Sequence, residues 1–187
     1  TWFSATLLPS GTVFVAGGGA ECGFWGCLAS AELLDLSVGA AGATGSLSTA
    51  RGAHIASVLP DGRVLVSGGY NGGRLSSAEV YDPSAGTFSS TGDMTQTREN
   101  FAATLLPSGK VLVVGGWANS GYLASAQLYD PASESFTSTG SLATGRNCHT
   151  ATLLPSGRVL VAGGDHYGEV SSAEVYDPVA GTFSPTG

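Results

Sequence analysis

The chain has 187 residues, of which 42% are hydrophobic and only 11% are charged, which excludes an intrinsically disordered chain. Its formal net charge of −7 would be repelled by phosphate backbones, which argues against a nucleic-acid partner. Its apolar runs are shorter than the roughly 18–20 residues that cross a bilayer, so we expect no membrane span. The 29 glycines stand in short clusters between apolar stretches, and this pattern predicts many short strands joined by tight turns.

One short pattern occurs four times along the chain. It begins as ATLLPSG at residues 5–11 and returns at residues 56–62, 103–109 and 151–157. Each copy is followed by an apolar run that ends in a pair of glycines, then by a polar loop, and then by Ala-Glu-Val-Tyr-Asp-Pro or a variant of it. The chain is therefore an internal repeat with a period of roughly 47–48 residues.

Each unit is predicted to form four strands, which we call a to d in chain order. Strand a is the Ala-Thr-Leu-Leu stretch, and Pro-Ser-Gly or Pro-Asp-Gly turns the chain because Pro presets φ and Gly accepts a positive φ. Strand b is the apolar run before the glycine pair. Strand c carries the Tyr of the Ala-Glu-Val-Tyr stretch, and strand d follows the Asp-Pro turn and carries Phe88, Phe136 or Phe183.

These units resemble kelch repeats over nearly the whole chain. The glycine pair after strand b, the Tyr on strand c and the aromatic residue on strand d match that family, although Phe stands where kelch repeats usually carry Trp. The resemblance implies an all-β fold, a kelch-type β-propeller of four four-stranded antiparallel blades. The chain would then be a single domain over residues 1–187, with blades at approximately 1–45, 46–92, 93–140 and 141–187.

The first unit departs from the pattern. Leu34 replaces the Tyr of strand c, Leu36 replaces the Pro after it, and Ala41 stands where strand d should carry Phe. Kelch propellers usually have six or seven blades, and an open stack of four would expose apolar faces on its first and last blades. We expect either a partial propeller that belongs to a longer chain with further blades, which is the favoured arrangement, or a ring closed by homo-oligomerisation.

One face of the predicted propeller is suited to binding. Because antiparallel strands reverse at every turn, the b–c loops and the d–a connections emerge on one face and the short, uniform a–b and c–d turns on the other. The b–c loops differ between units, and variation on a uniform scaffold is where binding surfaces are usually built. The predicted binding residues of these loops are Tyr70, Asn71, Arg74, Trp117, Asn119, Asp165, His166 and Tyr167.

Aromatic side chains beside amides and carboxylates suit a protein or carbohydrate ligand. The alternative is that these aromatics only cover the ends of the blades. Arg51, Arg98 and Arg146 recur before strand a, and one interpretation is a cationic ring for an anionic ligand. Their recurrence favours a structural role instead, either as ion pairs with Glu79 and Glu174 or as backbone hydrogen bonds that hold neighbouring blades together.

The histidines and cysteines give weaker signals. His54 and His149 share a position with Phe3 and Phe101, which favours packed sites over ligands. We expect no cofactor and no metal. The weak candidate for a metal site is the group Cys148, His149, Asp165 and His166, whose residue types bind Zn or Cu. Because side chains alternate in direction along a strand, these four would be divided between the two faces of the sheet.

A disulfide between Cys22 and Cys27 is predicted, with two free thiols as the alternative, and the disulfide would favour a secreted or cell-surface location. Residues 147–164 resemble the segment of galactose-oxidase-like proteins that bears their cross-linked cysteine, in register with Cys148. In those proteins the cysteine is cross-linked to a tyrosine. In the second unit of this chain, Ala53 stands at the position equivalent to that tyrosine.

Three hypotheses for the function follow. The favoured one is a non-catalytic kelch-repeat scaffold that binds a protein or glycan through the b–c loop face. The alternatives are a propeller segment of a larger galactose-oxidase-like or sugar-processing enzyme, and a structural repeat that self-assembles.

Overall fold

The computed structural model describes residues 2–19 and 26–186, and all regular secondary structure in this part of the chain is β-strand. Blade 1 consists of β1 (Ser4–Leu7), β2 (Thr12–Ala16), β3 (Ala31–Asp35) and β4 (Ala40–Ala43). Blade 2 consists of β5 (Ile55–Val58), β6 (Val64–Ser67), β7 (Ala78–Asp82) and β8 (Thr87–Ser90). Blade 3 consists of β9 (Ala102–Leu105), β10 (Val111–Val114), β13 (Ser125–Asp130) and β14 (Ser135–Ser141). Blade 4 consists of β15 (Thr150–Leu153), β16 (Val159–Ala162), β17 (Ala173–Asp177) and β18 (Thr182–Pro185).

Each blade is one antiparallel sheet whose strands lie in chain order, so the prediction of an all-β fold with four-stranded antiparallel units is confirmed. Blade 3 differs from the prediction in one respect. Its b–c loop contains a small hairpin of β11 (Trp117–Ala118) and β12 (Gly121–Tyr122), which the irregular loop sequence did not predict. The described residues contain no helix with the length and apolar character to cross a membrane.

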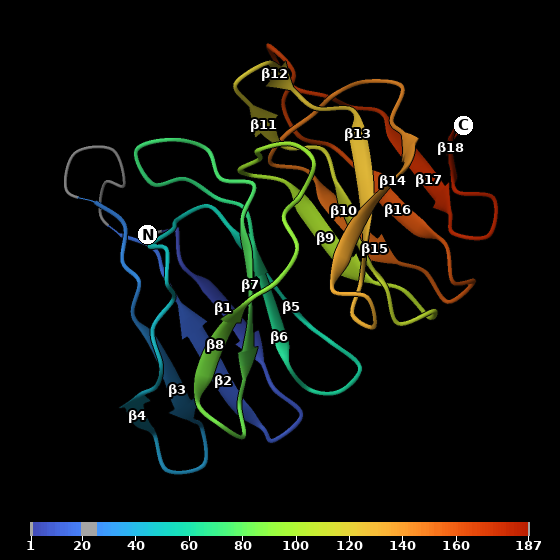
Figure 1. Ribbon diagram of the computed structural model, residues 1–187. Coiled ribbons are helices and arrows are strands. Elements are labelled where there is room, and N and C mark those ends of the chain that lie inside the picture. The colour runs from blue at the N-terminus through green and yellow to red at the C-terminus, as the bar shows by residue number, and fades with distance from the viewer. Residues whose placement is uncertain (1, 20–25, 187) are drawn as a thin grey trace.

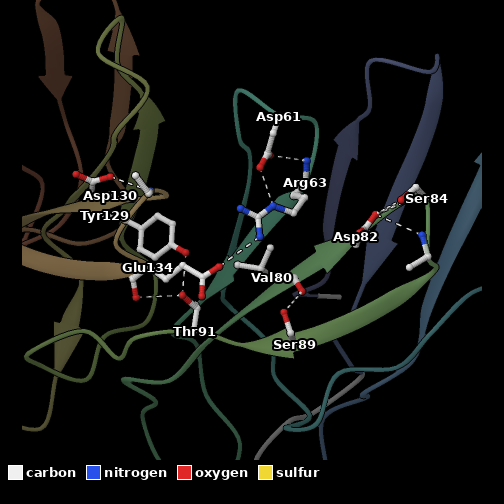
Figure 2. Close-up of polar contacts among 12 residues, drawn as sticks. Asp61, Arg63, Val80, Asp82, Ser84, Ser89, Thr91, Tyr129, Asp130 and Glu134 are labelled. Atoms are coloured by element: carbon white, nitrogen blue, oxygen red, sulfur yellow. Dashed lines mark hydrogen bonds and ion pairs between the residues drawn. The ribbon is translucent and has the colours of Figure 1, made fainter.

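The turns follow from local sequence chemistry. In the a–b turn the glycine has a positive φ, for example 88° at Gly11 and 83° at Gly109, which a side chain would disfavour. In the c–d turn the Asp side chain accepts hydrogen bonds from the backbone ahead of it. In blade 2, Oδ1 of Asp82 accepts from the N–H of Ser84 at 2.8 Å and from that of Ala85 at 3.3 Å (Figure 2).

The hydrophobic core lies between blades rather than within them. Because side chains alternate along a strand, each blade has two apolar faces. In blade 2, Val64 and Val66 pack toward Phe14 of blade 1, whereas Leu65 packs toward Val111 of blade 3. A third cluster joins blades 3 and 4 in the same way. A blade therefore needs a neighbour on each side to bury its apolar surface.

Polar contacts repeat at every blade interface on the side of the short turns. A Thr in or just after strand d bonds to the Tyr hydroxyl on strand c of the next blade: Thr91 Oγ1 lies 2.8 Å from the hydroxyl of Tyr129 (Figure 2), and Thr139 Oγ1 lies 2.8 Å from that of Tyr176. The N–H of the following glycine also bonds to the c–d turn of the next blade, as from Gly92 to the carbonyl of Glu134 at 2.9 Å. Each interface thus pairs one threonine with one tyrosine.

A second chain of contacts runs through the segments that precede strand a. The N–H of Ala53 donates to the carbonyl of Trp2, that of Asn100 to Ala53, and that of Cys148 to Asn100, at 3.0, 3.2 and 2.9 Å. All four residues have a positive φ, between 50° and 68°. This series of hydrogen bonds links the four blades on the side of the b–c loops.

Candidate functional site

The b–c loops of blades 2 to 4 begin at equivalent positions. Tyr70 pairs with Gly52, Trp117 with Glu99 and Asp165 with Asn147, so each loop extends the a–b hairpin of its own blade. Figure 1 shows the β11–β12 hairpin at the top of the molecule, whereas the turns that join β5 to β6 and β7 to β8 lie at the bottom. The variable loops therefore occupy the face opposite the uniform turns.

Four rings of this face form one group, which we call the aromatic cluster: Trp117 and Tyr122 from blade 3, and His166 and Tyr167 from blade 4. The Trp117 and Tyr122 rings meet edge to face with centroids 4.2 Å apart. The Tyr122 centroid lies 4.9 Å from both the His166 and the Tyr167 centroids. The cluster thus crosses the boundary between two blades and joins loops that are far apart in the sequence.

Polar groups surround the cluster. The hydroxyl of Tyr122 donates a hydrogen bond to Oδ2 of Asp165, and this bond raises the pKa of Tyr122. Arg74 of blade 2 lies with its guanidinium carbon 5.7 Å from the centroid of the Trp117 ring, within the range of a cation–π contact. Its Nε lies 2.8 Å from Oε1 of Glu99, and its Nη1 donates to Oδ1 of Asn119 at 3.1 Å. An ion pair and a hydrogen bond therefore hold Arg74 beside the Trp117 ring.

A cavity of about 330 Å³ lies beside these residues and is lined by Trp2, Tyr70, Arg74 and Glu99. Burial raises the pKa of the Glu99 carboxyl, while the neighbouring Arg74 acts in the opposite direction. Trp2 lines this cavity and is 54% exposed. Sequence reasoning missed Trp2 and Glu99, although both precede strand a and so belong to the face of the d–a connections.

Tyr167 is held in an unusual conformation. Its φ is 54°, in the left-handed region that favours glycine, and its side chain is 80% exposed. The loop is closed by the N–H of His166, which donates to the carbonyl of Gly168, and by the N–H of Gly168, which donates to Asp165. At the equivalent position blade 2 has Gly72, with a φ of 70°. A large side chain in this conformation costs about 1 kcal/mol.

The structure does not bring every predicted loop residue into this group. Asn71 is exposed at the tip of its loop, where its N–H bonds to the carbonyl of Gly73. The other predicted loop residues lie in the aromatic cluster, beside it or around the cavity; they are Tyr70, Arg74, Trp117, Asn119, Asp165, His166 and Tyr167.

Arg51, Arg98 and Arg146 lie inside the blades and are 0% exposed. Nη1 of Arg51 donates to the carbonyls of Gly68 and Ser77, and Nη2 lies 2.9 Å from Oε1 of Glu79. Arg146 repeats these contacts with Gly163, Ser172 and Glu174 in blade 4. These arginines tie strand b to strand c of their own blade and are not part of an accessible cationic ring.

Blade 3 lacks the carboxylate of this arrangement. Arg98 donates to the carbonyls of Gly115 and Ser125, but Gln127 stands where the other blades have Glu. Nε2 of Gln127 instead donates to Thr95 Oγ1 at 2.5 Å. Burial lowers the pKa of Arg98 to about 10.

The candidate metal cluster is not formed among the described residues, because His149 is directed away from Asp165 and His166. His149 is 7% exposed and its ring packs against Gly115 of blade 3, so that a Cβ on this glycine would lie 2.5 Å from Cε1 of the ring. Asp165 and His166 instead face Tyr122. Among the described residues no group of three or more His, Cys, Asp or Glu side chains is placed to hold a metal ion.

His54 occupies the same kind of inter-blade site as His149. Its ring packs against Gly17 of blade 1, and Nε2 lies 2.8 Å from Oγ of Ser4. Burial, together with the charge of the nearby arginine, lowers the pKa of each of these two histidines to about 4. Cys148 carries an exposed free thiol, and burial of part of it raises its pKa. Cys27 of the predicted Cys22–Cys27 disulfide is disulfide-bonded, and Cys22 lies outside the described residues.

Comparison with known protein families matches residues 51–95 to the Kelch motif. The match begins at Arg51 and spans all four strands of blade 2. The three other blades repeat its strand order and its glycine pair, and blades 3 and 4 also repeat its buried arginine. A search of curated proteins gave no significant match to the chain.

Proposed function

Because residues 51–95 match the Kelch motif and the other three blades repeat its strand order, we propose that this chain is a non-catalytic interaction scaffold that binds a protein or a glycan through its b–c loop face. The observation that carries this proposal is Tyr167, a large aromatic side chain that is 80% exposed on a backbone conformation suited to glycine. Strain at an exposed position gains nothing for folding, which is why it points to a function.

The surroundings of Tyr167 fit a contact surface. Aromatic residues and arginine dominate the energetics of protein interfaces, because they supply large, rigid area together with a polar group. Here the aromatic cluster adjoins Arg74, Glu99 and Asn119, which are held in place by their own ion pair and hydrogen bond. A pre-organised surface of this kind loses little side-chain entropy when a ligand binds.

The cavity beside the cluster suits a projecting group of the ligand. Trp2 and Tyr70 offer ring faces for an apolar or sugar surface, and the Arg74–Glu99 pair offers both donors and acceptors. A peptide side chain and a single sugar residue both have the size and the mixed polarity that such a cavity accepts. The cluster would then supply the wider contact around it.

The experiment compares Tyr167→Gly with the wild-type chain on two probes, a glycan array and peptides selected on the immobilised chain from a phage-displayed library. Gly72 shows that this backbone accepts glycine, so the variant is expected to keep its free energy of unfolding within about 1 kcal/mol. Its affinity for the selected probes should fall at least about tenfold, as is typical of an interface hot spot.

Val179→Ala is the matched control, because Val179 is 97% exposed on a c–d turn of the opposite face. It should bind the probes as the wild-type chain does. The proposal fails if neither probe type is bound, if Tyr167→Gly binds as tightly as the wild type, or if Val179→Ala loses as much affinity.

A further inference from the structure

The cavity of the b–c loop face is lined by four residues from three blades, which are Trp2, Tyr70, Arg74 and Glu99. Most of this lining is fixed by paired backbone. Tyr70 exchanges two hydrogen bonds with Gly52, at 2.8 and 3.0 Å, and also pairs with Arg74. Glu99 exchanges two hydrogen bonds with Trp117, at 2.8 and 3.0 Å. The walls of the cavity are therefore set before a ligand arrives, so binding loses little conformational entropy to ordering them.

The charges in the cavity balance each other. Nε of Arg74 lies 2.8 Å from Oε1 of Glu99, and their side chains are only 24% and 12% exposed. Because both groups are largely withdrawn from water, a ligand charge of either sign would be attracted by one of them and repelled by the other with little screening. A charged ligand would have to break this ion pair or bury a like charge beside it. The cavity thus favours a ligand without net charge.

The ion pair keeps hydrogen-bonding capacity for such a neutral ligand. Nη1 of Arg74 donates to Asn119, whereas Nη2 has no acceptor within the part of the chain that the structure describes. Glu99 contacts Arg74 through Oε1, and its Oε2 accepts no hydrogen bond from a described residue. One donor and one acceptor, on two groups that touch, are therefore left for a ligand that carries both kinds of group close together.

The aromatic part of the lining adds a second requirement. Trp2 and Tyr70 offer ring surface, which binds apolar C–H groups. An apolar peptide side chain would cover these rings but leave Nη2 and Oε2 without partners in a poorly hydrated place, which is unfavourable. A Ser, Thr, Asn or Gln side chain would satisfy the polar atoms but has little apolar surface. A sugar ring has both, because its hydroxyls lie around the edge and its C–H groups on the faces.

We propose that this cavity binds a neutral pyranose with two neighbouring free hydroxyls. One hydroxyl donates to Oε2 of Glu99 and the next accepts from Nη2 of Arg74, while a C–H face of the ring covers Trp2 and Tyr70. Uronic acids and protonated amino sugars are rejected because of their charge. This inference rests on the proposed function, since it names the ligand class of the same face and selects a glycan over a protein.

The first test needs no variant. Ligand-observed NMR titrations compare methyl glucoside, methyl galactoside and methyl mannoside with the uronic acid and the protonated amino sugar of the same ring. At least one neutral glycoside should bind the wild-type chain about tenfold more tightly than its charged counterparts, because each of those places a like charge beside one member of the ion pair.

The second test reverses the selectivity. Glu99→Gln leaves Arg74 unpaired at nearly constant volume, so it should weaken binding of the neutral glycoside about fivefold and make the uronic acid the preferred ligand. Arg74→Gln leaves Glu99 unpaired and should make the protonated amino sugar the preferred ligand. A purely structural role of the pair would weaken all three sugars alike. Asn71→Ala is the matched control, because Asn71 is exposed at the tip of the same loop, and it should keep the wild-type affinities.

Thermal unfolding checks that each variant is folded, and the wild-type order of affinities decides the matter if one is not. If selected peptides bind through Tyr167 while no neutral glycoside binds, the ligand class is wrong and the scaffold proposal stands. If neither a peptide nor any sugar binds, the proposed function fails and this inference with it. Equal binding of neutral and charged sugars by the wild-type chain, or an unchanged order of affinities in folded Glu99→Gln and Arg74→Gln, overturns the inference alone.

Discussion

The buried arginine of blade 3 gives the sharpest prediction, which is that Gln127→Glu stabilises the chain. Arg98 is 0% exposed and has no carboxylate against it, whereas Arg51 and Arg146 lie 2.9 and 3.2 Å from theirs. Burial lowers the pKa of Arg98 to about 10, well below the ordinary value of an arginine, which corresponds to about 3 kcal/mol of unfavourable burial for the charge.

A glutamate at position 127 would recover only part of this cost, since burying its own charge is also unfavourable. It would keep the hydrogen bond from the N–H of Thr95 and could accept one from the Thr95 hydroxyl, which now accepts from the amide. We therefore expect a gain of about 1–2 kcal/mol, or roughly 2–8 °C in the melting temperature of a chain of this size.

Urea and thermal unfolding of Gln127→Glu at neutral pH measure the effect, with Glu79→Gln and Glu174→Gln as the inverse changes in the neighbouring blades. Those two variants should lose stability, because each leaves a buried arginine in the situation of Arg98. If Gln127→Glu is neutral or destabilising and both inverse variants unfold like the wild type, the assignment of a stabilising role to the ion pairs is refuted.

Three further predictions concern the blade interfaces. His54 and His149 have a folded pKa of about 4, below the ordinary value of 6.5, so the unfolded chain takes up their protons first and stability should fall as the pH drops from about 6.5 to 4. Thermal scans across this range should show a smaller loss for His54→Phe with His149→Phe, which copies Phe3 and Phe101; an unchanged pH profile would contradict the assignment. Gly68→Ala should destabilise more than Gly163→Ala in urea titrations, because only the former meets the next blade, at 2.6 Å from Arg98, while both pay about 1 kcal/mol for a positive φ. Tyr129→Phe should cost about 1 kcal/mol through loss of its bond to Thr91, and the absence of any change would show that this contact does not stabilise the interface.

Short-range patterns made the blades predictable from the sequence. Alternating apolar residues, the Pro-x-Gly turn and the Asp-Pro turn act within a few residues, so they specify strands and hairpins without reference to the rest of the chain. The departures of blade 1 from the repeat pattern could also be read from the sequence. In the structure Leu34 pairs with Ala41, at the positions where blade 2 pairs Tyr81 with Phe88, as the alignment of the repeats predicts. The prediction that the b–c loops share one face required only that antiparallel strands reverse direction at every turn.

The site itself depended on contacts that no local pattern encodes. Arg74 meets Glu99 and Asn119, and Tyr122 meets Asp165 and Tyr167, across separations of 25 to 45 residues that the angle between blades decides. Arg51, Arg98 and Arg146 are buried by contacts within their own blades, and the packing of His149 against Gly115 of blade 3 separates it from His166. Recurrence in the sequence therefore determined what each blade is, while the stacking of one blade on the next decided which of its side chains are buried and which are presented together.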